Sequence, residues 1–349
     1  MKNFLIYGAY GYTGKLISEF AKEQGLSPIL AGRSKDKLKQ LAEKLGFQYK
    51  VFGLDEYDKL KEALNEVDAI LHCAGPFEFT CDTVSKACLE TKTHYLDITG
   101  EWTVFQKMHQ LDNEAKNNGI TIIPGTGFDV VPSDTLAHHL KQRVPDSIEL
   151  NLYLSGSGAM SHGTAITMVE NLGRGGLIRK DGELKHVKNM HESKEVEIDG
   201  KTYNAAAIPW GDVYTAYVST SIPNIVVYLT LPPKAIKISR LSNYFSWVFN
   251  FRFIKDFLIK QVKKKPAGPS DEIREKGETK ILGEVIDSKG NKFKSIFRGP
   301  EGYTLTALTA LIIVKKVLNG DYKTGFHTPS SAYGEGVIDE LKSAQIEDI

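Results

Sequence analysis

Residues 4–17 read FLIYGAYGYTGKLI, in which four apolar residues run directly into three glycines spaced three apart. The apolar run predicts a short buried strand, and the residues after the last glycine begin a helical pattern. Glycines between a strand and a helix let the backbone approach a phosphate, whose charge is met by the N–H groups at the start of the helix. The stretch therefore predicts a turn that binds the pyrophosphate of a dinucleotide, with the candidate residues Gly8, Tyr10, Gly11, Tyr12, Thr13 and Gly14.

The glycine spacing GxxGxxG is not the commonest fingerprint, so its interpretation needs support from the residues that follow. The second predicted strand supplies this support and also bears on which dinucleotide binds. The apolar run 28–31 leads into Arg33 and Ser34, about 20 residues after the glycines, where this fold meets the adenosine ribose. Arg33, Ser34 and Lys37 suit the 2′-phosphate of NADP better than the free ribose of NAD. We predict NADP, with NAD as the alternative. A second interpretation is that Ser34 only caps the next helix and that Arg33 is a solvated charge.

Length and composition limit the classes of protein. A chain of 349 residues predicts two domains, and 41% hydrophobic with 25% charged residues is typical of a soluble globular protein. The formal net charge of +1 gives no reason to expect nucleic acid as a partner. The three cysteines form no CxxC motif, and the histidines lack metal-binding spacing. We therefore expect no metal and a cytoplasmic location.

The first part of the chain alternates strand and helix patterns. Six apolar runs separated by helical patterns predict a Rossmann dinucleotide-binding domain over residues 1–135, in an α/β protein. Ligands bind such a sheet at the carboxyl ends of its strands. At these ends Asp55 is expected to meet the adenine half of the cofactor, and the loop Ala74, Gly75, Pro76 and Phe77 the nicotinamide half. The alternative is that Asp55 and the residues of this loop are ordinary turn residues without contact to a cofactor.

Three carboxylates follow the fifth and sixth predicted strands at the same edge. They are Asp97, Glu101 and Asp129. Each is a candidate for the general acid or base, or for orienting a cationic substrate group. The alternative for each is a helix cap or another structural hydrogen-bond acceptor.

Five segments, in this order, resemble the saccharopine dehydrogenase-like oxidoreductases, in particular the branch with trans-acting enoyl reductases. They are residues 8–14, 31–34, 73–77, 95–101 and 127–134. The second half matches less specifically, at residues 161–164, 302–303 and 328–334. The resemblance implies NAD(P) binding and hydride transfer. It does not determine the substrate, because the family acts on amino-acid derivatives, polyamines and acyl chains.

The pattern changes after residue 145, and residues 146–320 predict an α+β domain with a mostly antiparallel sheet for the substrate and for dimerisation. His162, in the loop 155–163, is a candidate proton donor or a solvated loop histidine. Strands are expected at 148–154, 196–203, 214–218 and 225–231, and a hairpin at 280–297. The apolar helix 303–318 predicts the core of this domain or the interface of a homodimer. By the resemblance, the tail 321–349 packs back on the first domain.

Residues 234–265 depart from ordinary globular composition. Nine basic residues stand against one acid, Asp256, and are interleaved with aromatic and aliphatic residues. The longest uncharged run, 241–251, has 11 residues and is too short to cross a bilayer, which needs about 20. The segment suits a peripheral contact with an anionic membrane or a cover over an acyl-binding channel. An amphipathic lid and a dimer contact are the alternatives.

These features together predict an NADPH-dependent enzyme that transfers hydride to an enoyl, acyl or other lipophilic small molecule. One alternative is a saccharopine-reductase-like enzyme that acts on an amino-acid imine, for which Arg174 and Arg179 are the candidate carboxylate-binding residues. Another is a non-catalytic, cofactor-binding protein at a membrane surface.

Overall fold

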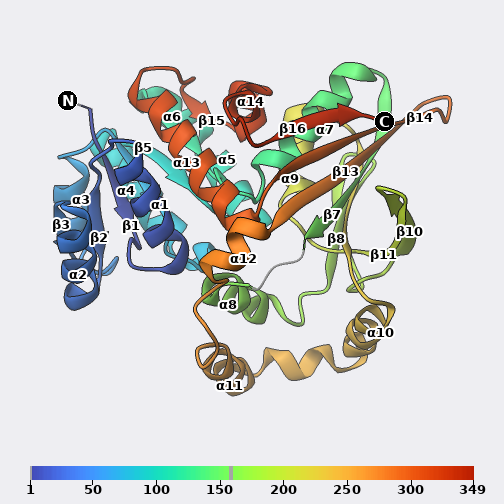
Figure 1. The fold of residues 1–349 in the computed structure, drawn as a ribbon, viewed down its shortest axis with the longest axis horizontal. Coiled ribbons are helices and arrows are strands. Elements are labelled where there is room, and N and C mark those ends of the chain that lie inside the picture. Colours follow the sequence, from blue (N-terminus) through green and yellow to red (C-terminus); the bar gives the residue numbers. More distant parts are fainter. Residues whose placement is uncertain (1, 157–159) are drawn as a thin grey trace. The chain divides into compact units, whose positions relative to one another are not determined.

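The computed structural model describes residues 2–156 and 160–349, and the chain forms two compact units (Figure 1). The first unit comprises Met1–Val131 and Tyr303–Leu341, and the second Pro132–Gly302 and Lys342–Ile349. The predicted loop 155–163 lies partly outside the described residues, at 157–159.

The first unit is built on a parallel sheet in the order β15-β6-β5-β4-β1-β2-β3. Every residue of β1, β2 and β4 is buried, as expected for a sheet covered on both faces. The strand order reverses between β1 and β4, and a doubly wound sheet binds its ligand at this point. The strands are β1 (Phe4–Tyr7), β2 (Ile29–Gly32), β3 (Tyr49–Val51), β4 (Ala69–His72), β5 (His94–Asp97), β6 (Thr121–Ile123) and β15 (Gly325–Phe326).

The helices of this unit connect successive strands and carry apolar residues on one face. Leu38, Leu41, Ala42 and Leu45, for example, are the buried positions of α2 and have helical spacing. The helices are α1 (Tyr12–Glu23), α2 (Lys35–Leu45), α3 (Tyr57–Leu64), η1 (Phe77–Phe79), α4 (Cys81–Thr91), α5 (Trp102–Gln110), α6 (Asp112–Asn118), α13 (Gly302–Leu318), α14 (Pro329–Tyr333) and α15 (Gly336–Asp339). The predicted Rossmann domain is confirmed.

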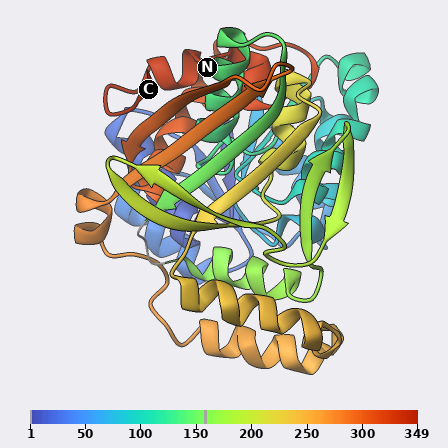
Figure 2. The same ribbon diagram turned by 90° about the vertical axis from the view of Figure 1, so that its right-hand side faces the viewer.

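The second unit contains a mixed sheet, in the order β10-β11-β12-β7-β13-β14-β16, with β8 paired to β12 and β9 to β8. Among the described strands of this second sheet, only β12 and β7 pair in parallel, and the other pairs are antiparallel. Figure 2 shows the long strands of this sheet lying side by side. The strands are β7 (Ser147–Gly156), β8 (Gly176–Lys180), β9 (Glu183–Val187), β10 (Ser193–Ile198), β11 (Lys201–Ala207), β12 (Asn224–Thr230), β13 (Glu278–Asp287), β14 (Lys292–Pro300) and β16 (Gln345–Asp348).

Helices of the second unit follow the sheet strands or connect them. They are α8 (His162–Asn171), α9 (Asp212–Thr220), α10 (Pro233–Leu241), η2 (Ser242–Asn250), α11 (Arg252–Val262) and α12 (Asp271–Lys276), and α7 (Val131–Arg143) enters the unit from the first. The predicted α+β second domain with a mostly antiparallel sheet is confirmed.

Three predicted elements of the chain are wrong in type or extent. Residues 214–218 form part of α9 and not a strand, because Val213, Ala216 and Thr220 are buried and recur with helical spacing. Residues 196–203 cover two strands, β10 and β11, which are joined at Asp199 and Gly200 with positive φ of 54° and 70°. A two-residue Asp-Gly turn of this kind favours a hairpin. The helical pattern of the sequence over residues 105–116 predicts one helix, but these residues are divided between α5 and α6.

The largest correction concerns α13, which was predicted as the core of the second domain or a dimer interface. All but the first of its residues belong to the first unit, and Leu311, Ile313 and Val314 are fully buried there. An apolar helix can fill the core of either domain, so its sequence does not identify which one. The tail is also divided, because residues 342–349 belong to the second unit and place β16 beside β14.

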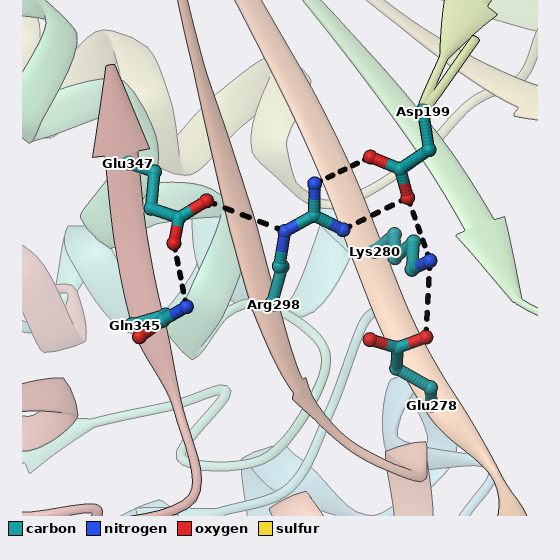
Figure 3. Close-up of polar contacts among 6 residues, drawn as sticks. All are labelled: Asp199, Glu278, Lys280, Arg298, Gln345 and Glu347. Atoms are coloured by element: carbon teal, nitrogen blue, oxygen red, sulfur yellow. Dashed lines mark hydrogen bonds and ion pairs between the residues drawn. The ribbon is translucent and has the colours of Figure 1, made fainter. Parts of the chain in front are cut away.

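A network of ion pairs ties the β10–β11 turn to the sheet of the second unit (Figure 3). The Arg298 guanidinium on β14 donates two hydrogen bonds to the Asp199 carboxylate, and Lys280 Nζ on β13 lies 2.7 Å from Asp199 Oδ2. Lys280 also pairs with Glu278 at 3.0 Å, and Arg298 with Glu347 on β16 at 3.5 Å. The two cations, Arg298 foremost, hold the pKa of Asp199 well below its usual range.

We expect Asp199→Asn to lower the melting temperature at pH 7. Because folding depresses the pKa of Asp199, its stabilisation is present above the unfolded-state pKa of about 4 and is lost as the pH falls below it. The difference from wild type, measured by thermal denaturation, should therefore shrink in acid. Asp181→Asn is the control, since Asp181 stands in a matching Asp-Gly turn, with φ of 53°, and has no ion pair among the described residues. Equal losses in both variants would mean that the turn, and not the network, matters.

Candidate functional site

The turn after β1 has the geometry of a phosphate cradle. Gly8 has a φ of +84°, and a Cβ there would lie 2.9 Å from the Cβ of Ala74. A Cβ on Gly14 would lie 2.4 Å from the Gly8 carbonyl oxygen, to which Gly11 N–H donates at 2.9 Å. Only glycine fits at positions 8 and 14, because any side chain would push the turn open.

The start of α1 suits an anion. Gly11 is the N-cap and no side chain caps it, and the first turn carries no acid. Thr13 lies partly exposed in this turn, and the ring of Tyr12 packs edge-on against Tyr303 of α13, with 5.0 Å between ring centres. The positive end of the helix is thus not neutralised by a side chain of the turn, and the predicted pyrophosphate fits here.

The loop after β2 presents two cations. Arg33 and Lys37 are both exposed, and Lys37 Nζ lies 5.7 Å from the centre of the Tyr10 ring. That ring covers Gly32, where a Cβ would approach it to 2.7 Å. Ser34 is the N-cap of α2, yet its side chain makes no capping hydrogen bond. Arg33 and Lys37 form no ion pair among the described residues, and their predicted contact with a 2′-phosphate stays a prediction.

Asp55 follows β3 in this unit and is exposed. Its Oδ1 lies over Gly53, at 2.2 Å from where a Cβ would stand, so the side chain folds back over its own turn. Its predicted contact with the adenine half of the cofactor stays a prediction.

The loop after β4 is held by Glu101. Glu101 Oε1 accepts a hydrogen bond from Phe77 N–H at 2.8 Å, and Oε2 accepts one from Glu78 N–H at 3.0 Å. Gly75 allows the Phe77 ring to approach, since a Cβ would lie 3.2 Å from it, and Pro76 leads into η1. Glu101 is 8% exposed and both its oxygens are engaged, so the geometry favours a structural role over the predicted acid–base role.

Two residues that the sequence did not single out support the same loop. The Thr80 hydroxyl donates to the Ala74 carbonyl at 3.1 Å and contacts His72 Nε2 at 2.8 Å. Burial lowers the pKa of His72 to about 3, so the ring is neutral at pH 7. A histidine inside an apolar strand was the available signal, because buried polar groups need partners.

Asp97 joins the ends of β5 and β6. Its side chain accepts hydrogen bonds from the Tyr95 hydroxyl at 2.7 Å and from the N–H groups of Thr99 and Gly125, each at 2.9 Å. Its carbonyl accepts from Thr126 N–H at 2.8 Å. Burial raises the pKa of Asp97 to about 6, against the opposing effect of these donors. Asp97 is fully buried, so the contacts again favour a structural role.

Asp129 differs from the other two carboxylates. Its Oδ1 is buried and has no hydrogen-bond partner among the described residues. Burial raises the pKa of Asp129 to about 7. Its side chain packs on Gly100, where a Cβ would lie 2.7 Å from the Asp129 Cβ. This carboxyl is therefore the one at the sheet edge with unused capacity to exchange a proton near neutral pH.

The backbone before Asp129 is positioned by α13. Thr306 Oγ1 accepts from Phe128 N–H at 2.9 Å, and the Thr309 hydroxyl donates to the Thr126 carbonyl at 2.8 Å. The two threonines were not predicted, although polar residues three apart in an apolar helix indicate a buried hydrogen-bonding face.

Comparison with known proteins agrees with this geometry. Residues 4–123 match the family model of the saccharopine dehydrogenase NADP binding domain. This part of the chain is thus similar to the saccharopine dehydrogenase NADP binding domain. The resemblance predicted from the sequence is confirmed, and with it an oxidoreductase family that binds a nicotinamide dinucleotide.

Relatives extend the likeness beyond this domain. The chain is 28% identical over 212 residues to a saccharopine dehydrogenase-like oxidoreductase of Rattus norvegicus, covering 53% of this chain and 49% of the rat protein. It is 29% identical over 150 residues to a trans-acting enoyl reductase of Mycobacterium ulcerans, covering 41% of this chain and 36% of that protein. The chain thus aligns with about half or less of the length of these relatives.

The fold of the whole chain also has a solved counterpart. Apo saccharopine dehydrogenase (L-Glu forming) from Saccharomyces cerevisiae covers all of both chains with a TM-score of 0.70. At 13% identity this likeness shows a shared fold alone.

Other predicted features of this saccharopine dehydrogenase-like chain lie outside the sheet edge. His162 begins α8 in the second unit, and its Nε2 lies 2.7 Å from the Lys265 carbonyl oxygen. Its predicted role in catalysis stays a prediction. The described residues contain no group of His, Cys, Asp and Glu that could hold a metal ion. In the same part of the chain, no helix has the length and hydrophobicity to span a membrane.

Replacing Arg33 tests the choice between the dinucleotides. We expect Arg33→Glu to weaken NADPH binding roughly 10- to 100-fold more than NADH binding, because a charged hydrogen bond contributes about 1.5–3 kcal/mol. Isothermal titration with each cofactor measures both affinities. Lys39→Glu makes the same charge change further along α2, where the side chain is 56% exposed, and should leave the ratio unchanged. Equal losses of both cofactors in Arg33→Glu would contradict the 2′-phosphate assignment.

Proposed function

We propose that this protein is an NADPH-dependent reductase of an enoyl, acyl or other lipophilic substrate, and that Asp129 supplies the proton. The observation that carries the proposal is the contrast among the three carboxylates. Both oxygens of Asp97 and of Glu101 accept hydrogen bonds, whereas the buried Oδ1 of Asp129 has no partner among the described residues. NADPH bound at the glycine turn supplies hydride, which leaves the reduced substrate in need of a proton.

The chain's own residues account for the remaining steps. The Gly8–Gly14 turn holds the pyrophosphate, and Arg33 and Lys37 select the 2′-phosphate. Glu101 fixes the loop 74–77 that faces the nicotinamide half. With a pKa of about 7, a substantial fraction of the Asp129 carboxyl is protonated at neutral pH and can donate its proton.

The substrate class rests on two observations. The relative in Mycobacterium ulcerans is a trans-acting enoyl reductase, which supports an enoyl substrate. Arg179, a candidate for binding an amino-acid carboxylate, is 6% exposed and is already engaged. Its Nε and Nη1 donate to the carbonyls of Val213 and Gly182, and its guanidinium lies 4.0 Å from the centre of the Tyr217 ring. The amino-acid imine thus has less support, and the cytoplasmic location and the homodimer stay predictions.

Asp129→Asn tests the proton donor. The variant should reduce kcat by roughly 10²- to 10⁴-fold, as loss of a general acid does. In wild type the reduction rate should fall as the pH rises through about 7, since the protonated carboxyl is the active form. This limb should be absent from the residual activity of Asp129→Asn. An unchanged pH–rate profile would remove Asp129 from the reaction.

Asp129→Asn should be more stable than wild type at alkaline pH. A carboxylate that accepts structural hydrogen bonds, such as Asp97, should show the opposite effect when it is replaced. Folding raises the pKa of Asp129 from about 4 to about 7, so wild type loses stability as the pH rises across this window. Above pH 7, Asp129→Asn should gain at least about 1 kcal/mol in the free energy of unfolding. Asp97→Asn, which weakens three hydrogen bonds, should instead lower stability at every pH.

Substrate class is tested by following NADPH oxidation with two sets of compounds. We expect turnover of enoyl thioesters, with kcat/KM rising with chain length as more apolar surface is buried. Saccharopine and related amino acids, with their imine precursors, form the comparison set. Turnover confined to this set would overturn the lipophilic assignment and leave the hydride-transfer proposal intact.

A further inference from the structure

Helices α10, η2 and α11 expose a cluster of large apolar side chains, which we call the aromatic face. Tyr244 is 76% exposed, Phe253 70% and Trp247 60%. Figure 1 shows these helices following one another along the lower part of the view, with η2 between α10 and α11. Members of the aromatic face are Ile238, Leu241, Tyr244, Phe245, Trp247, Phe251, Phe253 and Phe257, each at least 47% exposed. Soluble proteins rarely leave so many large apolar side chains together in water.

The exposed rings are contiguous. Trp247 packs edge-on against Phe251 with 6.0 Å between ring centres, and Phe251 lies 5.7 Å from Phe253. These contacts join the end of η2 to the start of α11. Trp247, Phe251 and Phe253 therefore form one continuous group of exposed rings.

The segment is attached to its unit by specific polar contacts. Arg240 donates to the Met190 carbonyl at 2.7 Å and to the Ser193 hydroxyl at 2.9 Å. Arg252 pairs with Glu170 at 3.0 Å, and Lys255 donates to the Glu170 carbonyl. These contacts involve Arg240, Arg252 and Lys255 and leave the members of the aromatic face exposed.

The remaining basic residues of the segment are not used for attachment. They are exposed and have no ion pair among the described residues, and they are Lys234, Lys237, Lys260, Lys263, Lys264 and Lys265. Apart from Asp256, which pairs with Arg252 at 2.8 Å, the segment contains no acid. Apolar side chains and uncompensated cations therefore occupy the same short segment.

We propose that residues 233–265 dock on the surface of an anionic phospholipid bilayer. The aromatic side chains suit the boundary between headgroups and acyl chains, and the lysines suit the negative surface of the leaflet. A second copy of the chain fits less well, because it would bring like charges together. The inference does not depend on the proposed reaction, since it rests on side chains of the second unit alone.

Vesicle binding tests the charge. The protein is sedimented with vesicles of phosphatidylcholine containing 30% phosphatidylserine, and with vesicles of pure phosphatidylcholine. We expect binding to the anionic vesicles that weakens with added salt. Lys263→Gln, Lys264→Gln and Lys265→Gln together should weaken it by roughly fivefold for each lysine. The matched control replaces Lys180, Lys201 and Lys289, three exposed lysines elsewhere in the unit, by Gln and should bind as wild type does.

The aromatic side chains are tested separately. Phe257→Ser should weaken binding about tenfold or more, because insertion buries the ring. Phe79→Ser is the control, since both rings are 59% exposed and Phe79 belongs to the first unit. Tryptophan emission should shift to the blue on binding, and Trp247→Phe should abolish most of the shift while retaining binding.

Three results of the vesicle experiments would overturn the proposal: no binding to anionic vesicles, equal binding to neutral vesicles, or equal effects of the two lysine triples. A fourth would be a dimer, detected by analytical ultracentrifugation, that dissociates in Phe257→Ser, because the aromatic face would then be buried between two copies of the chain. Thermal denaturation of each variant separates a loss of docking from a loss of folding.

Discussion

Hydrogen bonds to Asp97 connect the two loops on which the candidate site is built. One carboxylate accepts from the Tyr95 hydroxyl, from the turn after β5 and from the turn after β6, and the Asp97 carbonyl accepts from the second turn as well. Parallel strands end at one edge of the sheet, but their loops are held together there only if donors and acceptors match across the edge. With Asp97 in place, the backbone that leads to Asp129 is held at Gly125 and Thr126.

The three carboxylates differ in the backbone N–H groups that donate hydrogen bonds to them. Asp97 and Glu101 each bind backbone N–H groups, which stabilise a charged carboxylate and use its lone pairs. Asp129 is also shielded from water, but its Oδ1 has no such donor, so burial alone acts on its pKa. The same residue type at the same sheet edge is thus bound by backbone donors at Asp97 and keeps a buried oxygen without a donor, among the described residues, at Asp129.

Much of the first unit was predictable because its signals are local. The glycine turn, the strand that precedes it and the cations after β2 all lie within 37 residues, and each depends on backbone geometry or charge that a short segment determines. Residues 214–218 were misassigned for the opposite reason. Their propensity favours a strand, whereas burial on one side favours α9, and burial depends on neighbours distant in the chain. The same holds for α13, whose apolar residues do not indicate which core they fill.

The amino-acid sequence by itself determined the dinucleotide-binding fold, the resemblance to the saccharopine dehydrogenase NADP binding domain and the amphipathic character of residues 234–265, because glycine spacing, strand periodicity and charge are properties of short segments. Only the tertiary structure decided which carboxylate keeps a free oxygen, which unit contains α13 and which side chains of residues 234–265 remain exposed. These properties depend on donors and apolar surfaces that come from remote parts of the chain, such as Gly125 for Asp97 and Glu170 for Arg252. Burial and hydrogen-bond satisfaction are set by packing, and packing is complete only in the folded chain.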